Sequence, residues 1–141
     1  MTEPEHVLVP VDGSEPARDA LEFAVTNFPD SAFTLLHVIN PIRTFDVGHP
    51  DFWDDTQVES EREQADRLLE DLTDEIPGGT DVTTVAEFGD PAETIVEYAS
   101  LNDVDHVVVG SHGRSGVKRL VLGSVAEAVS RRATVPVSIV R

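Results

Sequence analysis

A glycine-rich, basic stretch toward the C-terminal end of the chain has the composition of an anion-binding loop. Residues 110–124 read GSHGRSGVKRLVLGS and contain four glycines and three of the chain's ten basic residues. Glycines such as Gly110 and Gly113 can adopt a positive φ and let backbone N–H groups approach a ligand closely. Successive N–H groups in such a loop form a nest for an anion, so this stretch is a candidate cradle for phosphate.

The same stretch ends where a helix is expected to begin, at Gly123 and Ser124. Unpaired N–H groups and the dipole at a helix start favour a phosphate group. A plainer interpretation stays open, in which the glycines only form a turn and Ser124 with Glu127 forms a capping box. The stretch contains neither a Walker A loop nor a Gly-x-Gly-x-x-Gly dinucleotide loop.

The rest of the chain alternates apolar strands with amphipathic helices. Strands are predicted at residues 6–11, 32–39, 81–88, 105–110 and 135–140. Helices are predicted to begin at Ser14, Thr56, Asp90 and Ser124, each with capping residues near its start. This order predicts an α/β fold, a parallel sheet covered by helices, within one domain over residues 1–141.

Ligands in such sheets bind beyond the carboxyl ends of the strands, where the strand order reverses. The first predicted strand leads into Asp12-Gly13, and the fourth leads into Gly110-Ser111. If these two strands are neighbours, the two turns face each other across one crevice. Asp-Gly-Ser after a strand is also an ordinary turn and helix entry, so a binding role for Asp12 is one of two interpretations.

Several segments together resemble the universal stress protein family. Gly110, Gly113, Gly123 and Ser124 fill the Gly-x2-Gly-x9-Gly-Ser/Thr pattern of its ATP-binding members. The segments HVLVPVDGSEPARDALEFA, LLHVI and GDPAETIVEYA are similar to that family's first strand and turn, second strand and third helix. The resemblance covers essentially the whole chain. It implies a doubly wound five-stranded parallel sheet of order 3-2-1-4-5 with helices on both faces, the adenine nucleotide alpha hydrolase-like fold.

The resemblance also implies a binding site for ATP, or for AMP or ADP, with Mg²⁺ screening the phosphates. Asp12 is expected on the ribose hydroxyls, because a carboxylate accepts hydrogen bonds from hydroxyl groups and is a poor neighbour for phosphate. The expected surroundings of the adenine are Pro10, Val11 and Val38. The residues expected around the phosphates are Gly110, His112, Gly113, Arg114, Ser115, Gly123, Ser124 and Val125. For His112 a simple turn position is an equal alternative, and His37 is interpreted as a strand histidine with a satisfied hydrogen bond.

No catalytic set is evident in the sequence. A phosphatase of the haloacid dehalogenase type needs a second aspartate two residues after Asp12, where Ser14 stands. A receiver domain needs a lysine before the fifth strand, where Arg132-Ala133-Thr134 stands. We therefore expect a nucleotide-binding stress or regulatory protein without enzymatic activity, or at most with slow ATP hydrolysis. The alternative is a dimeric adaptor of the same fold that binds no nucleotide.

Composition limits the partners and compartments. The net charge is −17, the basic residues are nine Arg and one Lys, and cysteine is absent. Such acidity opposes binding to nucleic acids or anionic membranes, and it suggests a halophilic source. No apolar run approaches membrane-spanning length, so we expect a cytoplasmic protein. The apolar last strand, residues 135–140, is expected at a sheet edge, where it favours pairing with another strand, and the family resemblance implies a homodimer formed through it.

Overall fold

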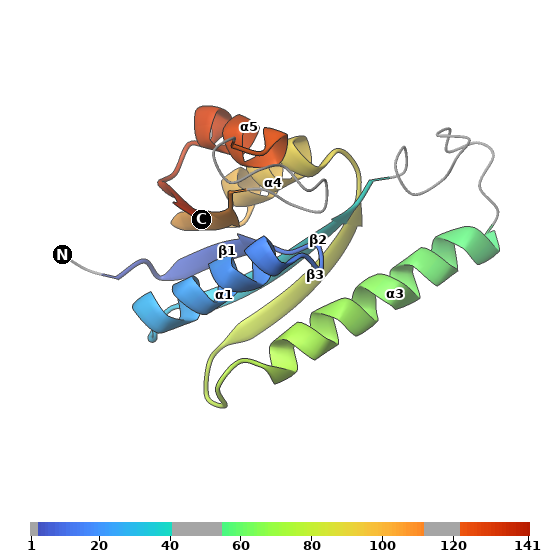
Figure 1. The fold of residues 1–141 in the computed structure, drawn as a ribbon, viewed down its shortest axis with the longest axis horizontal. Helices are drawn as coiled ribbons and strands as arrows, with labels where there is room; N and C mark the ends of the chain where they lie inside the picture. The colour runs from blue at the N-terminus through green and yellow to red at the C-terminus, as the bar shows by residue number, and fades with distance from the viewer. Residues whose placement is uncertain (1–2, 41–54, 112–121) are drawn as a thin grey trace.

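Five parallel strands form one sheet in the order β3-β2-β1-β4-β5, as expected. The computed structural model describes residues 3–40, 55–111 and 122–141. The elements are β1 (His6–Pro10), α1 (Glu15–Asn27), β2 (Ala32–Ile39), α3 (Asp55–Asp74), β3 (Val82–Phe88), α4 (Pro91–Leu101), β4 (His106–Gly110), α5 (Ser124–Arg132) and β5 (Val137–Val140). Helices α1 and α3 cover one face of the sheet, and α4 and α5 cover the other (Figure 1).

The two faces of the sheet are buried in two separate apolar clusters. Successive side chains of a strand point to opposite faces, so Val7 and Val9 of β1 pack under α1 and α3, whereas Leu8 packs under α4 and α5. All three of these side chains have 0% exposure. A fully buried side chain of this size contributes about 1.5–3 kcal/mol, so the central strands are firmly held and provide a rigid base for the turns at their ends.

The edge strands are less buried than the central ones. No residue of β5 or β3 is fully buried, and β3 has both half-buried and exposed positions. The fifth strand begins at Val137 and not at residue 135 as predicted. The cause is Pro136, which has no N–H to donate to a ladder, although its carbonyl accepts from Val107 N (3.0 Å).

Two predicted helix caps are confirmed, the third is wrong, and the predicted start of α5 is confirmed. Ser14 accepts a hydrogen bond from Ala17 N (3.3 Å), and Asp90 accepts one from Glu93 N (3.0 Å). Thr56 lies inside α3, which already includes Asp55. Gly123 is the N-cap of α5 and Ser124 is its first helical residue, as expected, so the alternative capping box of Ser124 with Glu127 does not form.

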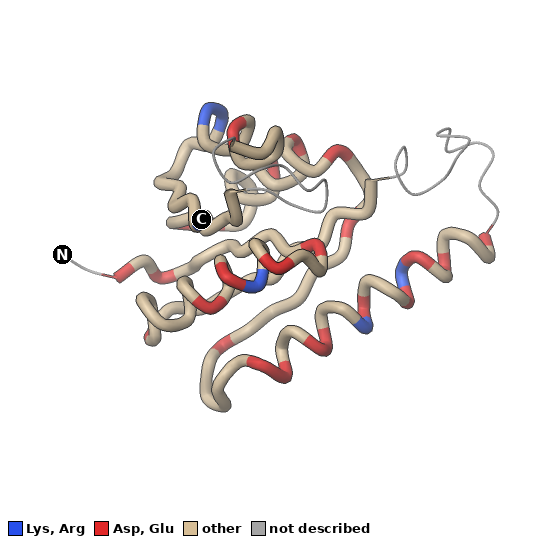
Figure 2. Tube along the Cα trace, viewed as in Figure 1, with Lys and Arg blue, Asp and Glu red and all other residues tan. Residues whose placement is uncertain are grey.

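Acidic residues dominate the described surface. They follow one another along α1 and α3, whereas Lys and Arg are few there and reappear at the end of α5 (Figure 2). In the part of the chain that the structure describes, no helix is both long enough and apolar enough to cross a membrane.

Candidate functional site

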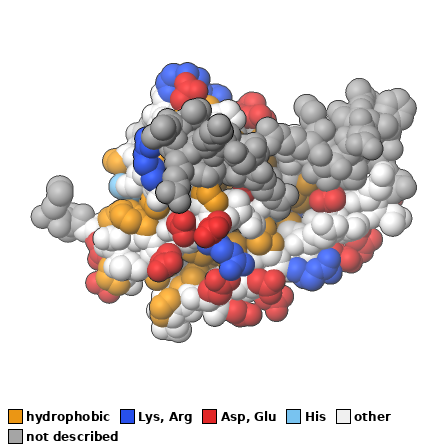
Figure 3. Space-filling model, viewed as in Figure 1, with side chains coloured by type: hydrophobic (Ala, Val, Ile, Leu, Met, Phe, Trp, Pro, Cys, Tyr) orange, Lys and Arg blue, Asp and Glu red, His pale blue; other side chains and the backbone are white. Residues whose placement is uncertain are grey.

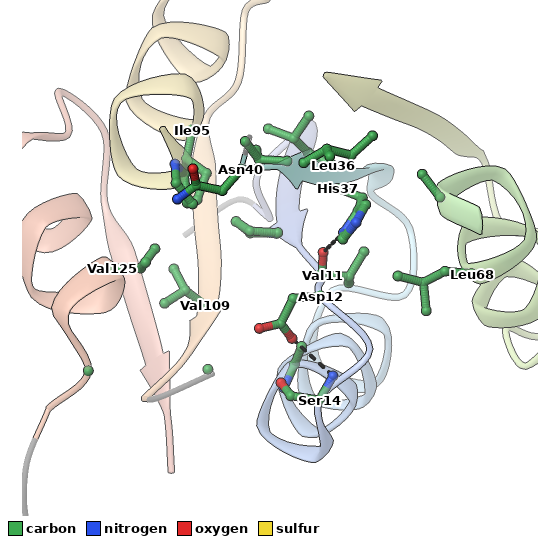
Figure 4. Close-up of a pocket in the computed structure, with 18 of the residues that line it drawn as sticks. Val11, Asp12, Ser14, Leu36, His37, Asn40, Leu68, Ile95, Val109 and Val125 are labelled. Atoms are coloured by element: carbon green, nitrogen blue, oxygen red, sulfur yellow. Dashed lines mark hydrogen bonds between the residues drawn. The ribbon is translucent and has the colours of Figure 1, made fainter. Parts of the chain in front are cut away.

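A cavity of about 340 Å³ opens beyond the carboxyl ends of β1, β2 and β4. Strand β1 pairs with β2 on one side and with β4 on the other. The chain therefore leaves β1 and β4 in different directions, and this is the point at which α/β sheets bind ligands. Figure 4 shows Asp12 between Val109 and Val125 on one side and Leu68 of α3 on the other.

The turn after β1 brings Asp12 to this cavity. Ser14 N donates a hydrogen bond to Asp12 Oδ1 (3.0 Å), and Gly13 between them has a φ of 82°. This left-handed conformation suits glycine, which has no Cβ. Ser14 in turn caps α1. The local sequence Asp-Gly-Ser thus forms the tight turn and the helix start together, with the carboxylate at the cavity wall.

Gly110 at the end of β4 differs from its prediction. It is not among the described glycines with a positive φ, and it is paired with Val140 as part of the sheet. A Cβ on Gly110 would lie 2.7 Å from the carbonyl oxygen of Pro16, which is closer than real Cβ contacts allow. Gly110 lines the cavity, but its missing side chain serves the close packing of α1 on β4.

The start of α5 forms the wall opposite Asp12. Gly123 is buried, and its N–H donates to Ser111 O (2.6 Å). Ser111 N donates to Val140 O (2.8 Å), so this start is tied to β5 through the end of β4. Gly123, Ser124 and Val125 all line the cavity. In the described part of the chain no side chain caps this helix, whose first residues lie at the cavity.

Glu127 lies in the first turn of α5, where its negative charge opposes an anion at the helix start. Its carboxylate pairs with Arg131 one turn further on, at 2.7 Å. Both side chains are exposed, so the Arg131 guanidinium offsets part of the Glu127 charge at the helix start.

Eight of the twelve site residues predicted from the sequence line the cavity. They are Pro10, Val11, Asp12, Val38, Gly110, Gly123, Ser124 and Val125. The other four, His112, Gly113, Arg114 and Ser115, lie outside the described residues. The structure thus brings the turn after β1, the end of β2 and the start of α5 to one place.

Other residues of the cavity wall were missed by the sequence analysis. Asn40 follows the end of β2, and Pro91 and Ile95 come from α4. Helix α3 contributes Glu61, Gln64, Ala65 and Leu68, spaced as one face of a helix. The sequence shows this periodicity, which indicates that one face of the helix is buried. It does not indicate which part of the helix reaches the cavity.

His37 has the satisfied hydrogen bond that the sequence analysis expected, and it also lines the cavity. Its Nδ1 donates to Val11 O (2.8 Å), a bond drawn in Figure 4. A carbonyl oxygen only accepts hydrogen bonds, so Nδ1 carries the proton.

The charge at the described wall comes from two carboxylates, those of Asp12 and Glu61. In residues 3–40, 55–111 and 122–141, no three His, Cys, Asp or Glu side chains gather into a group that could hold a metal ion. The wall therefore offers oxygen acceptors beside an apolar surface and a helix start, an arrangement suited to a ligand with both an apolar ring and an anionic part.

Comparison with known proteins identifies relatives of the whole chain. Residues 4–141 match the model of the universal stress protein family. The universal stress protein YxiE of Bacillus subtilis (strain 168) is 32% identical over 144 residues, which cover 96% of this chain and 97% of YxiE. The solved structure of MJ0577, a universal stress protein of Methanocaldococcus jannaschii, has a TM-score of 0.85 and 31% identity, covering 96% of this chain and 94% of that one.

Two more distant structures share the fold and were solved with nucleotides. A universal stress protein in complex with cAMP has a TM-score of 0.73 at 24% identity and covers 99% of both chains. One from Archaeoglobus fulgidus in complex with dAMP has a TM-score of 0.64 at 21% identity and covers 100% of both chains. With its sheet order, its cavity at the strand ends and a family match that spans nearly every residue, this chain belongs to the universal stress protein family.

Proposed function

We propose that this protein binds an adenine nucleotide, ATP first of all, in the cavity beyond β1 and β4, and that binding serves a stress-response or regulatory role. The observation that carries the proposal is that Asp12 and the start of α5 at Gly123 and Ser124 line one cavity. Two family structures that hold cAMP and dAMP support adenine as the base. No residue is assigned a catalytic role.

The phosphates belong at the start of α5. Helices α1 and α4 have side-chain caps, from Ser14 and Asp90, whereas the described residues provide none for α5. An anion at a helix N-terminus is stabilised by about 0.3–1 kcal/mol, and by up to about 2 kcal/mol in partly buried sites. The exposed hydroxyl of Ser124 adds a hydrogen-bond donor. The motif residues His112, Gly113, Arg114 and Ser115 would complete this phosphate site.

The sugar and base belong nearer β1 and β2. Asp12 would accept hydrogen bonds from the ribose hydroxyls. The width of the cavity would keep its carboxylate away from the phosphates. Pro10, Val11 and Val38 supply an apolar wall for the adenine, to which Ile95 of α4 adds. Because dATP lacks one of the two hydroxyls, it should bind more weakly than ATP.

The described residues fit a Mg²⁺ ion only as a companion of the nucleotide. They contain no group of three metal-binding side chains. Mg²⁺ commonly retains several waters and binds through one or two carboxylates together with substrate phosphates. Asp12 and Glu61 are the described carboxylates at the cavity, so we infer that the ion enters bound to the phosphates.

Isothermal titration calorimetry with ATP and Mg²⁺ in molar salt tests the proposal. We expect one ATP per chain, and Ser124→Ala should weaken binding because a hydrogen bond to a charged phosphate contributes about 1.5–3 kcal/mol. Ser130→Ala is the matched control, since Ser130 lies on the same helix and its hydroxyl donates to Glu127 O. Absence of binding by the unsubstituted protein would leave the dimeric adaptor as the function to pursue.

We also propose a homodimer formed through the C-terminal strand, residues 135–140. Strand β5 lies at the sheet edge beside β4, and all four of its residues are only half-buried. An apolar edge strand of this kind favours pairing with another strand. Light scattering at working salt should give twice the chain mass, and a monomer mass would reject the dimer.

A further inference from the structure

We propose that His37 is a positioning residue for Asp12, acting through the hydrogen bond from its Nδ1 to the carbonyl of Val11. This inference rests on the proposed function, because it gives His37 a role in the affinity for the adenine nucleotide. His37 would not need to contact the nucleotide itself.

The Val11 carbonyl belongs to the peptide group that continues into Asp12. A peptide group is planar, so its carbonyl, the following N–H and the following Cα move together. Holding the Val11 oxygen at 2.8 Å from His37 Nδ1 therefore fixes the direction in which the chain enters Asp12. The position of the Asp12 carboxylate at the cavity depends on that direction.

This peptide group lies just beyond the end of β1. Strand β1 ends at Pro10, one residue earlier, and Gly13, one residue later, has the left-handed φ of 82°. Val11 N donates to Leu36 O (2.9 Å), which holds the preceding peptide group. Consecutive residues of β2, Leu36 and His37, thus hold the two sides of Val11.

Loss of the His37 donor would leave the Val11 carbonyl oxygen without this hydrogen bond. Val11 is 3% exposed, so water reaches its carbonyl poorly, and a buried acceptor without a donor is destabilised. The peptide group would rotate toward another donor and would carry the start of Asp12 with it. We therefore expect the main effect of losing this donor to be weaker binding of the nucleotide, with a smaller effect on the free energy of unfolding.

The donor nitrogen does not depend on the charge of the ring. Both ring nitrogens carry protons in the charged form, and in the neutral form the carbonyl acceptor requires the proton on Nδ1. The hydrogen bond to Val11 O therefore does not require a charged ring.

Variants of His37 separate the bond from the ring. Asparagine places its amide nitrogen as many bonds from Cβ as Nδ1, so His37→Asn can still donate to Val11 O, whereas His37→Leu cannot. We expect His37→Leu to raise the Kd for Mg²⁺-ATP about five- to tenfold, the size expected for one lost hydrogen bond. His37→Asn should stay within about twofold of the unsubstituted protein. His37→Gln, with its amide one bond further out, should behave like His37→Leu and replaces it if the leucine variant does not fold.

His6→Leu is the matched control. His6 lies at the other end of β1, where its Nε2 bonds Thr34 Oγ1 (2.7 Å), so its loss should leave the Kd unchanged. Two readouts do not use the ligand. Nitrogen NMR with the His37 ring in its neutral form should show the proton on Nδ1. The backbone amide signals of Asp12 and Gly13 should shift in His37→Leu much more than in His37→Asn.

The outcomes are decisive in both directions. An unprotonated Nδ1, an unchanged Kd in His37→Leu, or an equal loss in His37→Asn and His37→Leu would overturn the positioning role. If the unsubstituted protein bound no adenine nucleotide, the proposed function would fail, and the NMR measurements would still test whether His37 holds the Asp12 turn.

Discussion

At the residue scale, the Asp12 carboxylate has two roles: it accepts a hydrogen bond within its own turn, and we propose that it binds the ribose. One oxygen accepts from Ser14 N at 3.0 Å, and the side chain lines the cavity. Asparagine keeps an oxygen acceptor for Ser14 N and removes the charge. The two roles can therefore be separated by one conservative substitution.

We expect Asp12→Asn to fold with near-unchanged stability and to bind ATP about five- to tenfold more weakly. The physical reason is that a hydroxyl donates more strongly to a carboxylate than to a neutral amide oxygen. Calorimetry and thermal unfolding measure the two effects. Asp90→Asn, the same change at the cap of α4, should leave the affinity unchanged. Tighter binding by Asp12→Asn would mean that the carboxylate mainly repels phosphate.

Among the residues that the structure describes, His106 has a shifted pKa, and the cause of the shift is burial. Burial lowers its pKa from 6.5, while its Nε2 bonds Ser138 Oγ (2.8 Å) and its ring lies 5.3 Å from that of Phe28. A lowered pKa means that the unfolded chain binds a proton more readily than the folded protein. The contribution to the free energy of unfolding is therefore complete above pH 6.5 and is lost as the pH falls below that value.

His106→Gln should remove this pH dependence while keeping a side-chain amide near Ser138. Chemical unfolding of both proteins from pH 8 to pH 5 at constant salt measures the difference between them, so that titration of the carboxylates cancels. The free energy of unfolding of the unsubstituted protein should fall relative to that of His106→Gln as the pH falls below 6.5. A difference that stays constant, or grows at low pH, would contradict the shift.

What the sequence could predict at this scale depended on local chemistry. Ser14 and Asp90 were predicted as caps because capping involves neighbours along the chain. The contact of Gly110 with Pro16 joins residues nearly a hundred positions apart. Such contacts follow from how the elements pack, and the sequence around Gly110 gives no sign of them.

At the element scale, the close approach of α1 to β4 aligns the two turns of the cavity. A Cβ on Gly110 would lie 2.7 Å from the oxygen and 2.8 Å from the carbon of the Pro16 carbonyl. These are backbone atoms at the start of α1, so α1 itself would have to move.

Gly110→Ala should therefore destabilise the protein by about 1–3 kcal/mol, the usual cost of overpacking. Gly78→Ala is the control, because a Cβ there meets nothing within 4 Å and no left-handed φ is involved. It should be neutral or stabilising by up to about 1 kcal/mol. Urea unfolding compares the two variants, and equal stabilities would show that α1 adapts without cost.

The elements themselves were largely predictable. The apolar runs of β1, β2 and β4 are short and nearly continuous, as buried parallel strands require, and the structure places them at or within one residue of the predicted bounds. One boundary failed where a single residue overrides the pattern, as Pro136 does before β5, whereas the predicted start of α5 at Ser124 is confirmed. The parallel sheet follows from the alternation of elements, whereas its order 3-2-1-4-5 came from the family resemblance.

At the scale of the whole molecule, the charge is the dominant feature. The net charge is −17, and acidic side chains are scattered over the described part of the face in Figure 3, where basic ones are fewer. Arg18 pairs with Glu75 at 3.2 Å, but both groups are exposed and such pairs contribute little. Self-repulsion of this kind destabilises the folded state and is screened by salt.

We expect the melting temperature to fall steadily as KCl is reduced from molar to about 0.1 M concentrations. Sucrose at low salt is the control, because it favours burial without screening charge. Calorimetric melting curves measure both. A melting temperature that is independent of salt would reject the halophilic interpretation of the composition.

The most direct test of the nucleotide site is a crystal structure of the protein grown with ATP and Mg²⁺ in high salt. We predict phosphate oxygens within hydrogen-bond distance of backbone N–H groups at the start of α5, around Ser124 and Val125, with the ribose at Asp12. A cavity filled by the protein's own side chains despite abundant ATP, or ATP bound elsewhere, would contradict the proposed function.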